Sequence, residues 1–155
     1  MSVVTLPQET EVLELVGGLL GAAASSTAAS SDDVHSIAEY TDESGQRFGL
    51  IGCDLSGGCR LGAALTLIPA GRVDEAVAEG AIPDSLSENL DEVFNVFVAL
   101  LTPVDGTRIV MGRSAHGSSH PDFEELSKAL SESGPTAFGI DIPRYGQCTL
   151  HIAGC

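Results

Sequence analysis

Residues 83–101, PDSLSENLDEVFNVFVALL, constrain the fold of this chain more than any other stretch. Apolar side chains recur there at the spacing of one helix face. They are Leu86, Leu90, Val93, Phe94, Phe97, Leu100 and Leu101. The opposite side carries Glu88, Asp91, Glu92 and Asn95. The pattern predicts an amphipathic helix that buries its apolar stripe and exposes its polar face.

Both ends of this helix are marked in the sequence. Ser85 and Glu88 have the S-x-x-E spacing of a capping box, in which each side chain accepts a hydrogen bond from the other residue's backbone amide. Pro103 closes the stretch, because proline restricts the residue before it and lacks an amide hydrogen. We therefore expect the helix to begin near Ser85 and to present Glu92 and Asn95, three residues apart, as exposed neighbours.

Length and charge narrow the classes of function. A chain of 155 residues predicts one domain over residues 1–155. Seven Lys and Arg against 22 Asp and Glu give a net charge of −15, which repels phosphate backbones and acidic lipids. Nucleic acid and anionic membranes are therefore poor partners, and a basic or cation-bearing protein surface is a better one.

We expect the protein to be cytoplasmic. The apolar segment 16–24 is too short to span a bilayer, and the first residues have neither the basic region nor the apolar core of a signal peptide. The four cysteines lack the CxxC spacing of a zinc ribbon or a redox motif. In a reducing compartment they are expected to be packed or free thiols.

The first half of the chain reads as a helix followed by strands. Helical spacing predicts a helix over residues 8–24, and the polar tract 25–33 predicts a loop. Alternation with a turn at Gly45 predicts a hairpin over residues 34–40 and 47–53, and a third strand is expected over residues 60–68.

The second half predicts helices over residues 70–79 and 119–131 and a strand over residues 107–111. A loop is expected over residues 112–118, and a closing hairpin over residues 136–142 and 147–153. The fold class that follows is α+β, a mostly antiparallel sheet with helices packed on one face.

This order of elements, with a helix carrying Glu-x-x-Asn, resembles the CheC/CheX/FliY family of chemotaxis phosphatases, and CheX-like proteins in particular. The family's motif is Asp or Ser, three residues, Glu, two residues and Asn on an exposed helix face. Glu92 and Asn95 match the last two positions, and Glu88 stands where the family has Asp or Ser.

The resemblance implies a phosphatase that acts on the aspartyl-phosphate of a CheY-like response regulator in a two-component signalling system. It implies that Asn95 orients the attacking water and that Glu92 contacts a lysine of the partner, with Glu88 and Asp91 on the same binding face. Phosphoryl transfer depends mainly on positioning and charge neutralisation, so a side-chain amide that orients the attacking water is sufficient for catalysis. The protein needs no cofactor of its own, since the partner regulator brings Mg²⁺.

Other interpretations stay open at this point. A non-catalytic adaptor of the same fold would use the same acidic face only for binding. A metal-binding domain would draw on His116, His120, Cys53 and Cys59, although no zinc motif joins them. Family members can also form homodimers through a sheet edge, for which the closing hairpin is a candidate.

Overall fold

A computed structural model describes residues 3–155, and the first two residues of the predicted domain lie outside this range. The first half of the chain forms β1 (Val4–Thr5), α1 (Glu9–Leu20), β2 (Ser25–Thr27), β3 (Val34–Thr41), β4 (Arg47–Asp54), α2 (Leu55–Leu65) and α3 (Ala70–Glu79). The second half forms α4 (Asp84–Val96), the 3-10 helix η1 (Phe97–Leu100), β5 (Thr102–Pro103), β6 (Val110–His116), α5 (Phe123–Glu132), β7 (Thr136–Ile142) and β8 (Gly146–Gly154).

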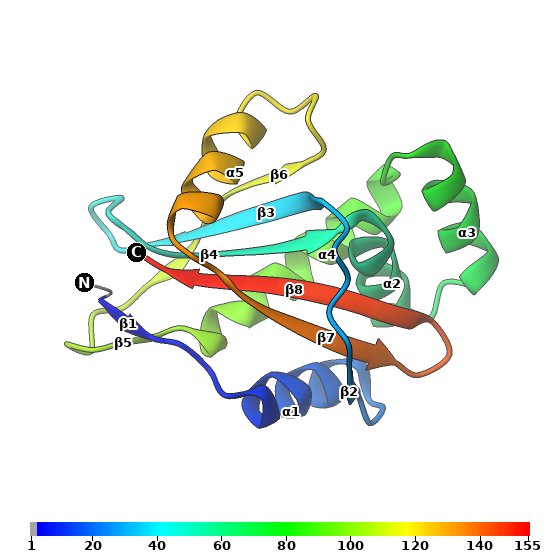
Figure 1. The fold of residues 1–155 in the computed structure, drawn as a ribbon, viewed down its shortest axis with the longest axis horizontal. Helices are drawn as coiled ribbons and strands as arrows, with labels where there is room; N and C mark the ends of the chain where they lie inside the picture. Colours follow the sequence, from blue (N-terminus) through cyan, green and yellow to red (C-terminus); the bar gives the residue numbers. More distant parts are fainter. Residues whose placement is uncertain (1–2) are drawn as a thin grey trace.

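A mostly antiparallel sheet organises the fold, as the sequence predicted (Figure 1). Its strand order is β2-β7-β8-β4-β3-β6, and every neighbouring pair is antiparallel. The predicted hairpins β3–β4 and β7–β8 are both present. The closing hairpin lies inside the sheet, so the two terminal strands are β2 and β6. Pairing of two copies through a sheet edge stays a prediction that involves these strands rather than the hairpin.

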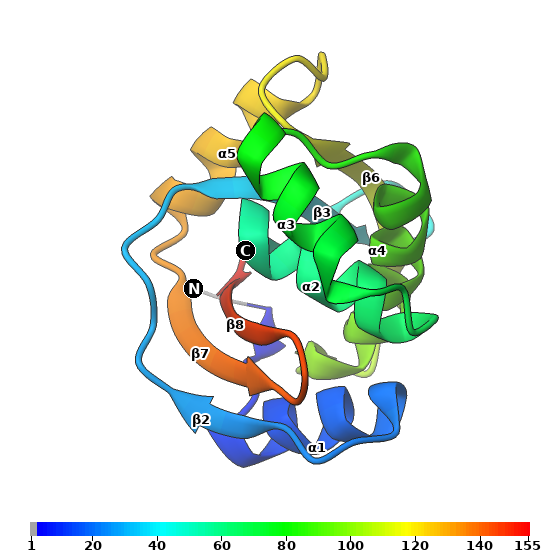
Figure 2. The same cartoon turned by 90° about the vertical axis from the view of Figure 1, so that its right-hand side faces the viewer.

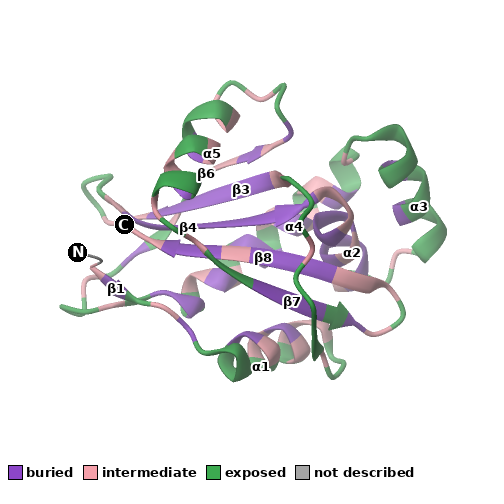
Figure 3. Ribbon diagram, viewed as in Figure 1, coloured by how far each residue is buried: buried purple, intermediate pink, exposed green. Residues whose placement is uncertain are grey.

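The larger core lies between one face of the sheet and the helices α1, α2 and α4. Ile51, Leu150 and Ile152 of the central strands face this layer, together with Leu90 and Phe94 of α4. Figure 3 shows how burial runs along the central strands and the inner sides of these helices. α3 packs outside this layer, against α2 and the start of α4.

One helix departs from the predicted arrangement on a single face. α5 packs on the other face, where Leu126 and Leu130 contact Ile37 and Leu50 (Figure 1). Continuous burial of the central strands explains the difference, because β3 and β4 are buried along almost their whole length rather than at every second residue. A sheet with two apolar faces must be shielded from water on both faces, and here helices do this on each side.

Three segments have structures other than the expected ones. The strand expected over residues 107–111 and the loop expected over residues 112–118 are replaced by one strand, β6, which runs from Val110 to His116. The expected strand 60–68 is wrong, because most of it belongs to helix α2. The polar tract 25–33 contains β2 and then crosses β7 and β8. There the Gln147 amide donates to the Ala28 carbonyl, and the Ser30 amide donates to Thr149 Oγ1 at 2.9 Å.

Candidate functional site

Two glycines of α2 set the position of α4. A Cβ on Gly62 would lie 2.5 Å from the carbonyl oxygen of Leu86, and one on Gly58 would lie 3.0 Å from Leu90 Cδ2. Gly58 and Gly62 are four residues apart, as are Leu86 and Leu90, so the two helices touch along one ridge. The absent side chains let the helix backbones approach closely, which fixes which side of α4 is buried.

The C-terminal end of α4 is anchored from the sheet. The Tyr40 hydroxyl, fully buried, donates to the Phe94 carbonyl oxygen at 2.6 Å. The rings of Phe94 and Phe97 pack edge to face with centroids 6.4 Å apart. Asn95 therefore lies between a residue whose carbonyl oxygen is hydrogen-bonded to the sheet, Phe94, and a buried aromatic residue, Phe97.

The polar face of α4 is oriented as the sequence predicted. Glu88, Glu92 and Asn95 are all exposed. None of these three side chains has a hydrogen bond or ion pair within the part of the chain that the structure describes. Figure 2 shows α4 along the right-hand border of the molecule. Glu92 and Asn95 lie one helical turn apart and are free to reach outward from it.

Asp91 differs from the other three residues of the predicted binding face. Its Oδ1 accepts a hydrogen bond from Ser114 Oγ at 2.8 Å and lies 2.8 Å from His116 Nε2. Both partners belong to β6, a strand at the sheet edge. Burial works to raise the pKa of Asp91, but the hydrogen bonds from His116 and Ser114 outweigh it and lower the pKa. Asp91 therefore joins α4 to the sheet instead of standing free.

The His116 ring is fixed on both sides. Because a carboxylate only accepts, Nε2 carries a proton, and Nδ1 lies 2.9 Å from the buried hydroxyl of Ser36. The imidazole also stacks on Phe94 with an interplanar angle of 12°. Although Ser36, His116 and Asp91 form a chain of contacts, Ser36 is only 1% exposed and cannot meet a substrate. This arrangement orders the site; it does not form a hydrolase triad.

The start of α4 corrects a prediction. The helix begins at Asp84 after Pro83, and no side chain caps its first amides. Ser85 and Glu88 form no capping box, since proline at the cap position leaves the first turn to start without one. Glu88 is consequently exposed and available to a partner.

The residues of the metal-binding interpretation are not brought together. Cys53 is buried in β4 and Cys59 is buried in α2, whereas His116 lies in β6 and His120 in the following loop. Within residues 3–155 no group of three His, Cys, Asp or Glu side chains is placed to hold a metal ion. All four cysteines are free thiols, as predicted.

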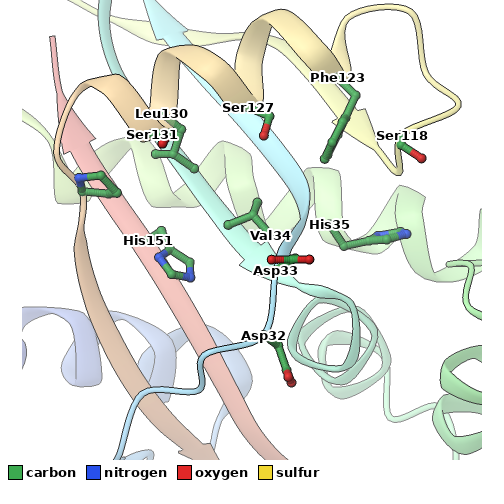
Figure 4. Close-up of a pocket in the computed structure, with 11 residues that line it drawn as sticks. Asp32, Asp33, Val34, His35, Ser118, Phe123, Ser127, Leu130, Ser131 and His151 are labelled. Carbon is green, nitrogen blue, oxygen red and sulfur yellow. The ribbon is translucent and has the colours of Figure 1, made fainter.

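A pocket of about 580 Å³ lies away from α4, between α5, residues 32–35 and β8 (Figure 4). Its lining includes His35, His151, Ser127 and Ser131. Burial lowers the pKa of both histidines. His35 Nδ1 and His151 Nε2 are buried without a partner among the described residues, so neither atom is open to a molecule in the pocket. Among the described residues, no hydrogen bond joins either histidine ring to Ser127 or Ser131.

No helix in residues 3–155 has the length and apolar character needed to cross a membrane.

Comparison with known proteins gives a likeness in fold. No family model and no curated protein matches the sequence. The structure is similar to the chemotaxis protein CheX from Vibrio vulnificus, with a TM-score of 0.42, 9% identity, and coverage of 94% of this chain and 92% of that one. It is also similar to CheX in a CheX–CheY–BeF₃–Mg²⁺ complex from Borrelia burgdorferi, with a TM-score of 0.43, 14% identity, and coverage of 91% and 90%.

Both similar structures are of CheX proteins, the class that the order of elements and the Glu-x-x-Asn motif resemble.

Proposed function

We propose that this protein is a CheX-like phosphatase that hydrolyses the aspartyl-phosphate of a response regulator. The observation that carries the proposal is the placement of Glu92 and Asn95, exposed and unpartnered on neighbouring turns of a helix that is anchored on its other side. Such a helix can enter the active site of another protein without rearranging.

Asn95 supplies the chemistry in this proposal. Its amide both donates and accepts, so it can hold a water in line with the phosphorus atom. Glu92 pairs with a lysine of the regulator and fixes the approach. The regulator brings its own Mg²⁺, which neutralises the charge of the transferring group. Glu88, one turn before Glu92, adds a negative charge that favours a cationic partner.

The test measures loss of the phosphoryl group from a phosphorylated CheY-like regulator, with and without this protein. We expect the wild type to accelerate the loss, and Asn95→Ala to remove about a hundredfold of that acceleration while binding is retained. Glu92→Gln should weaken binding about tenfold, because it removes the ion pair with the partner lysine. Glu75→Gln on the exposed side of α3 is the matched control and should change neither quantity.

The outcomes separate the two candidate functions. Equal rates for wild type and Asn95→Ala, both above the spontaneous rate, would remove Asn95 from the mechanism. Binding without any acceleration would make the protein an adaptor that uses the same face. A regulator that binds with equal strength to wild type and Glu92→Gln would show that α4 is not the docking surface.

A further inference from the structure

Two residues other than glycine have a left-handed backbone in the part of the chain that the structure describes. They are Leu67, with φ +57°, and Arg144, with φ +74°. For a residue with a Cβ this conformation costs about 1 kcal/mol or more. Backbone strain of this kind concentrates at functional sites, where the strained residue's side chain takes part in binding or catalysis.

Both residues stand where glycine is the usual choice. Leu67 follows α2 and ends it, with the Ile68 amide donating to the Ala63 carbonyl at 2.9 Å. The same role at the ends of α1 and α3 is filled by Gly21 and Gly80. The chain therefore uses glycine for this turn twice and leucine once.

Arg144 lies in a tight turn between β7 and β8. The Tyr145 amide donates to the Ile142 carbonyl at 3.0 Å, and Pro143 precedes Arg144. Proline followed by a left-handed residue defines a type II turn, whose second central position favours glycine. An arginine at this position is strained for the same reason as Leu67.

The two strained residues line one pocket of about 480 Å³. It lies between the end of α1, the end of α2 and the β7–β8 turn, on the end of the molecule that Figure 2 faces. The Tyr145 hydroxyl donates to the Ile68 carbonyl at 2.8 Å and so joins the two strained turns. Buried Ala64 and Ile142 form apolar lining beneath exposed Leu67.

Charge narrows the class of ligand. Arg144 is exposed and has no acidic partner among residues 3–155, whereas Arg47 and Arg113 are paired. One free guanidinium beside apolar walls matches a ligand with one carboxylate and an apolar tail. The net charge of −15 disfavours polyanions such as nucleotides or an acidic membrane surface.

We propose that this pocket binds a small apolar monocarboxylate, with the carboxylate on Arg144 and the tail against Leu20, Ala64 and Leu67. The proposal is independent of the function assigned to α4. It explains why both turns keep a strained side chain, since glycine at either position would relax the backbone and remove a ligand contact.

The test is calorimetric titration of the full chain with decanoate below its micelle concentration. We expect saturable binding at one site, and at least tenfold weaker binding of decanol, which lacks the charge. Arg144→Gly should weaken decanoate binding at least tenfold and raise the melting temperature of the unliganded protein. Leu67→Gly should likewise raise the melting temperature and weaken binding. Arg72→Gln, which removes an exposed cation from α3, is the control and should leave binding unchanged.

Three results would overturn the proposal. They are absence of saturable decanoate binding to the wild type, equal affinity of wild type and Arg144→Gly, and equal affinity for decanoate and decanol. A fall in melting temperature for both glycine variants would show that the two turns are not strained, which removes the reason for assigning the pocket a ligand.

Discussion

Asp91 of α4 and His116 of the edge strand β6 lie in direct contact, with 2.8 Å between Oδ1 and Nε2. This contact ties the helix that carries Glu92 and Asn95 to the border of the sheet. It also divides the predicted binding face, since Asp91 is engaged while Glu88, Glu92 and Asn95 are free. In this structure, then, Asp91 is a positioning residue next to the site.

Replacing Asp91 tests that role. Asp91→Asn weakens the contacts with both His116 and Ser114, and we expect a loss of about 2 kcal/mol in the free energy of unfolding. Glu92→Gln, one residue along, should change it by less than about 0.5 kcal/mol because its side chain has no partner to lose. Urea unfolding monitored by circular dichroism measures both. Similar losses of stability for the two variants would contradict the claim that Asp91 is engaged in contacts while Glu92 is free.

A second prediction concerns the ion-pair network beneath α5. Glu39 binds both Arg47 and Arg113, with nitrogen–oxygen distances of 2.9 and 2.6 Å. Burial raises the pKa of Glu39, but the hydrogen bonds from Arg113 and Arg47 outweigh it and bring the pKa to about 2, from an ordinary 4.5. The charged form is therefore favoured by folding.

Between pH 4.5 and about 2 the unfolded chain takes up this proton before the folded one does, so Glu39 contributes stability that is lost as the pH falls through this window. We expect the melting temperature to drop more steeply in this range for the wild type than for Glu39→Gln. Parallel pH profiles of the two proteins would show that the network does not depend on the charge of Glu39.

The sequence predicted the exposed face of α4 more fully than it predicted the packing beneath this helix. The helical period over residues 83–101 correctly separated buried Leu90 and Phe94 from exposed Glu92 and Asn95, because that separation depends on local spacing alone. Both hairpins were also correct, for the same reason.

The packing of α2 against α4 was not predicted, because the residues that allow it are glycines and not large apolar side chains. The stretch from Arg60 to Ile68 alternates well enough to suggest a strand, yet Gly58 and Gly62 are spaced for one helix face that meets α4. Glycine four residues from glycine was a detectable sign of close helix packing. In contrast, the contact of Asp91 with His116 depends on how β6 pairs with β3, where the register shifts between Ala38 and Tyr40, and no local pattern specifies it.

The cysteines give a third prediction. Cys53, Cys59 and Cys148 are fully buried, and burial raises the pKa of each thiol. Cys155 is only half-buried, although burial raises its pKa as well. A thiol reagent acts on the exposed thiolate, so Cys155 should react first in the native protein. Mass spectrometry should find one label on the wild type and none on Cys155→Ser before unfolding. Labelling of Cys155→Ser at the wild-type rate would place another thiol within reach of solvent.

The closest approach of α2 to α4 gives the last prediction. In a helix, alanine in place of glycine is usually stabilising by about 1 kcal/mol. At Gly18 of α1, where a Cβ would meet nothing within 4 Å, Gly18→Ala should follow this rule. At Gly62 the new Cβ would lie 2.5 Å from the Leu86 carbonyl, a backbone atom that cannot turn aside.

Gly62→Ala must therefore push α4 away from α2, and we expect a loss of about 2 kcal/mol or more in the free energy of unfolding, opposite in sign to Gly18→Ala. Chemical denaturation of the two variants side by side measures the difference. Because α4 carries Glu92 and Asn95, Gly62→Ala should also reduce the acceleration of regulator dephosphorylation, whereas Gly18→Ala should not. A stabilised Gly62→Ala protein would mean that the two helices are not held together by this contact, and the placement of the exposed pair would need another explanation.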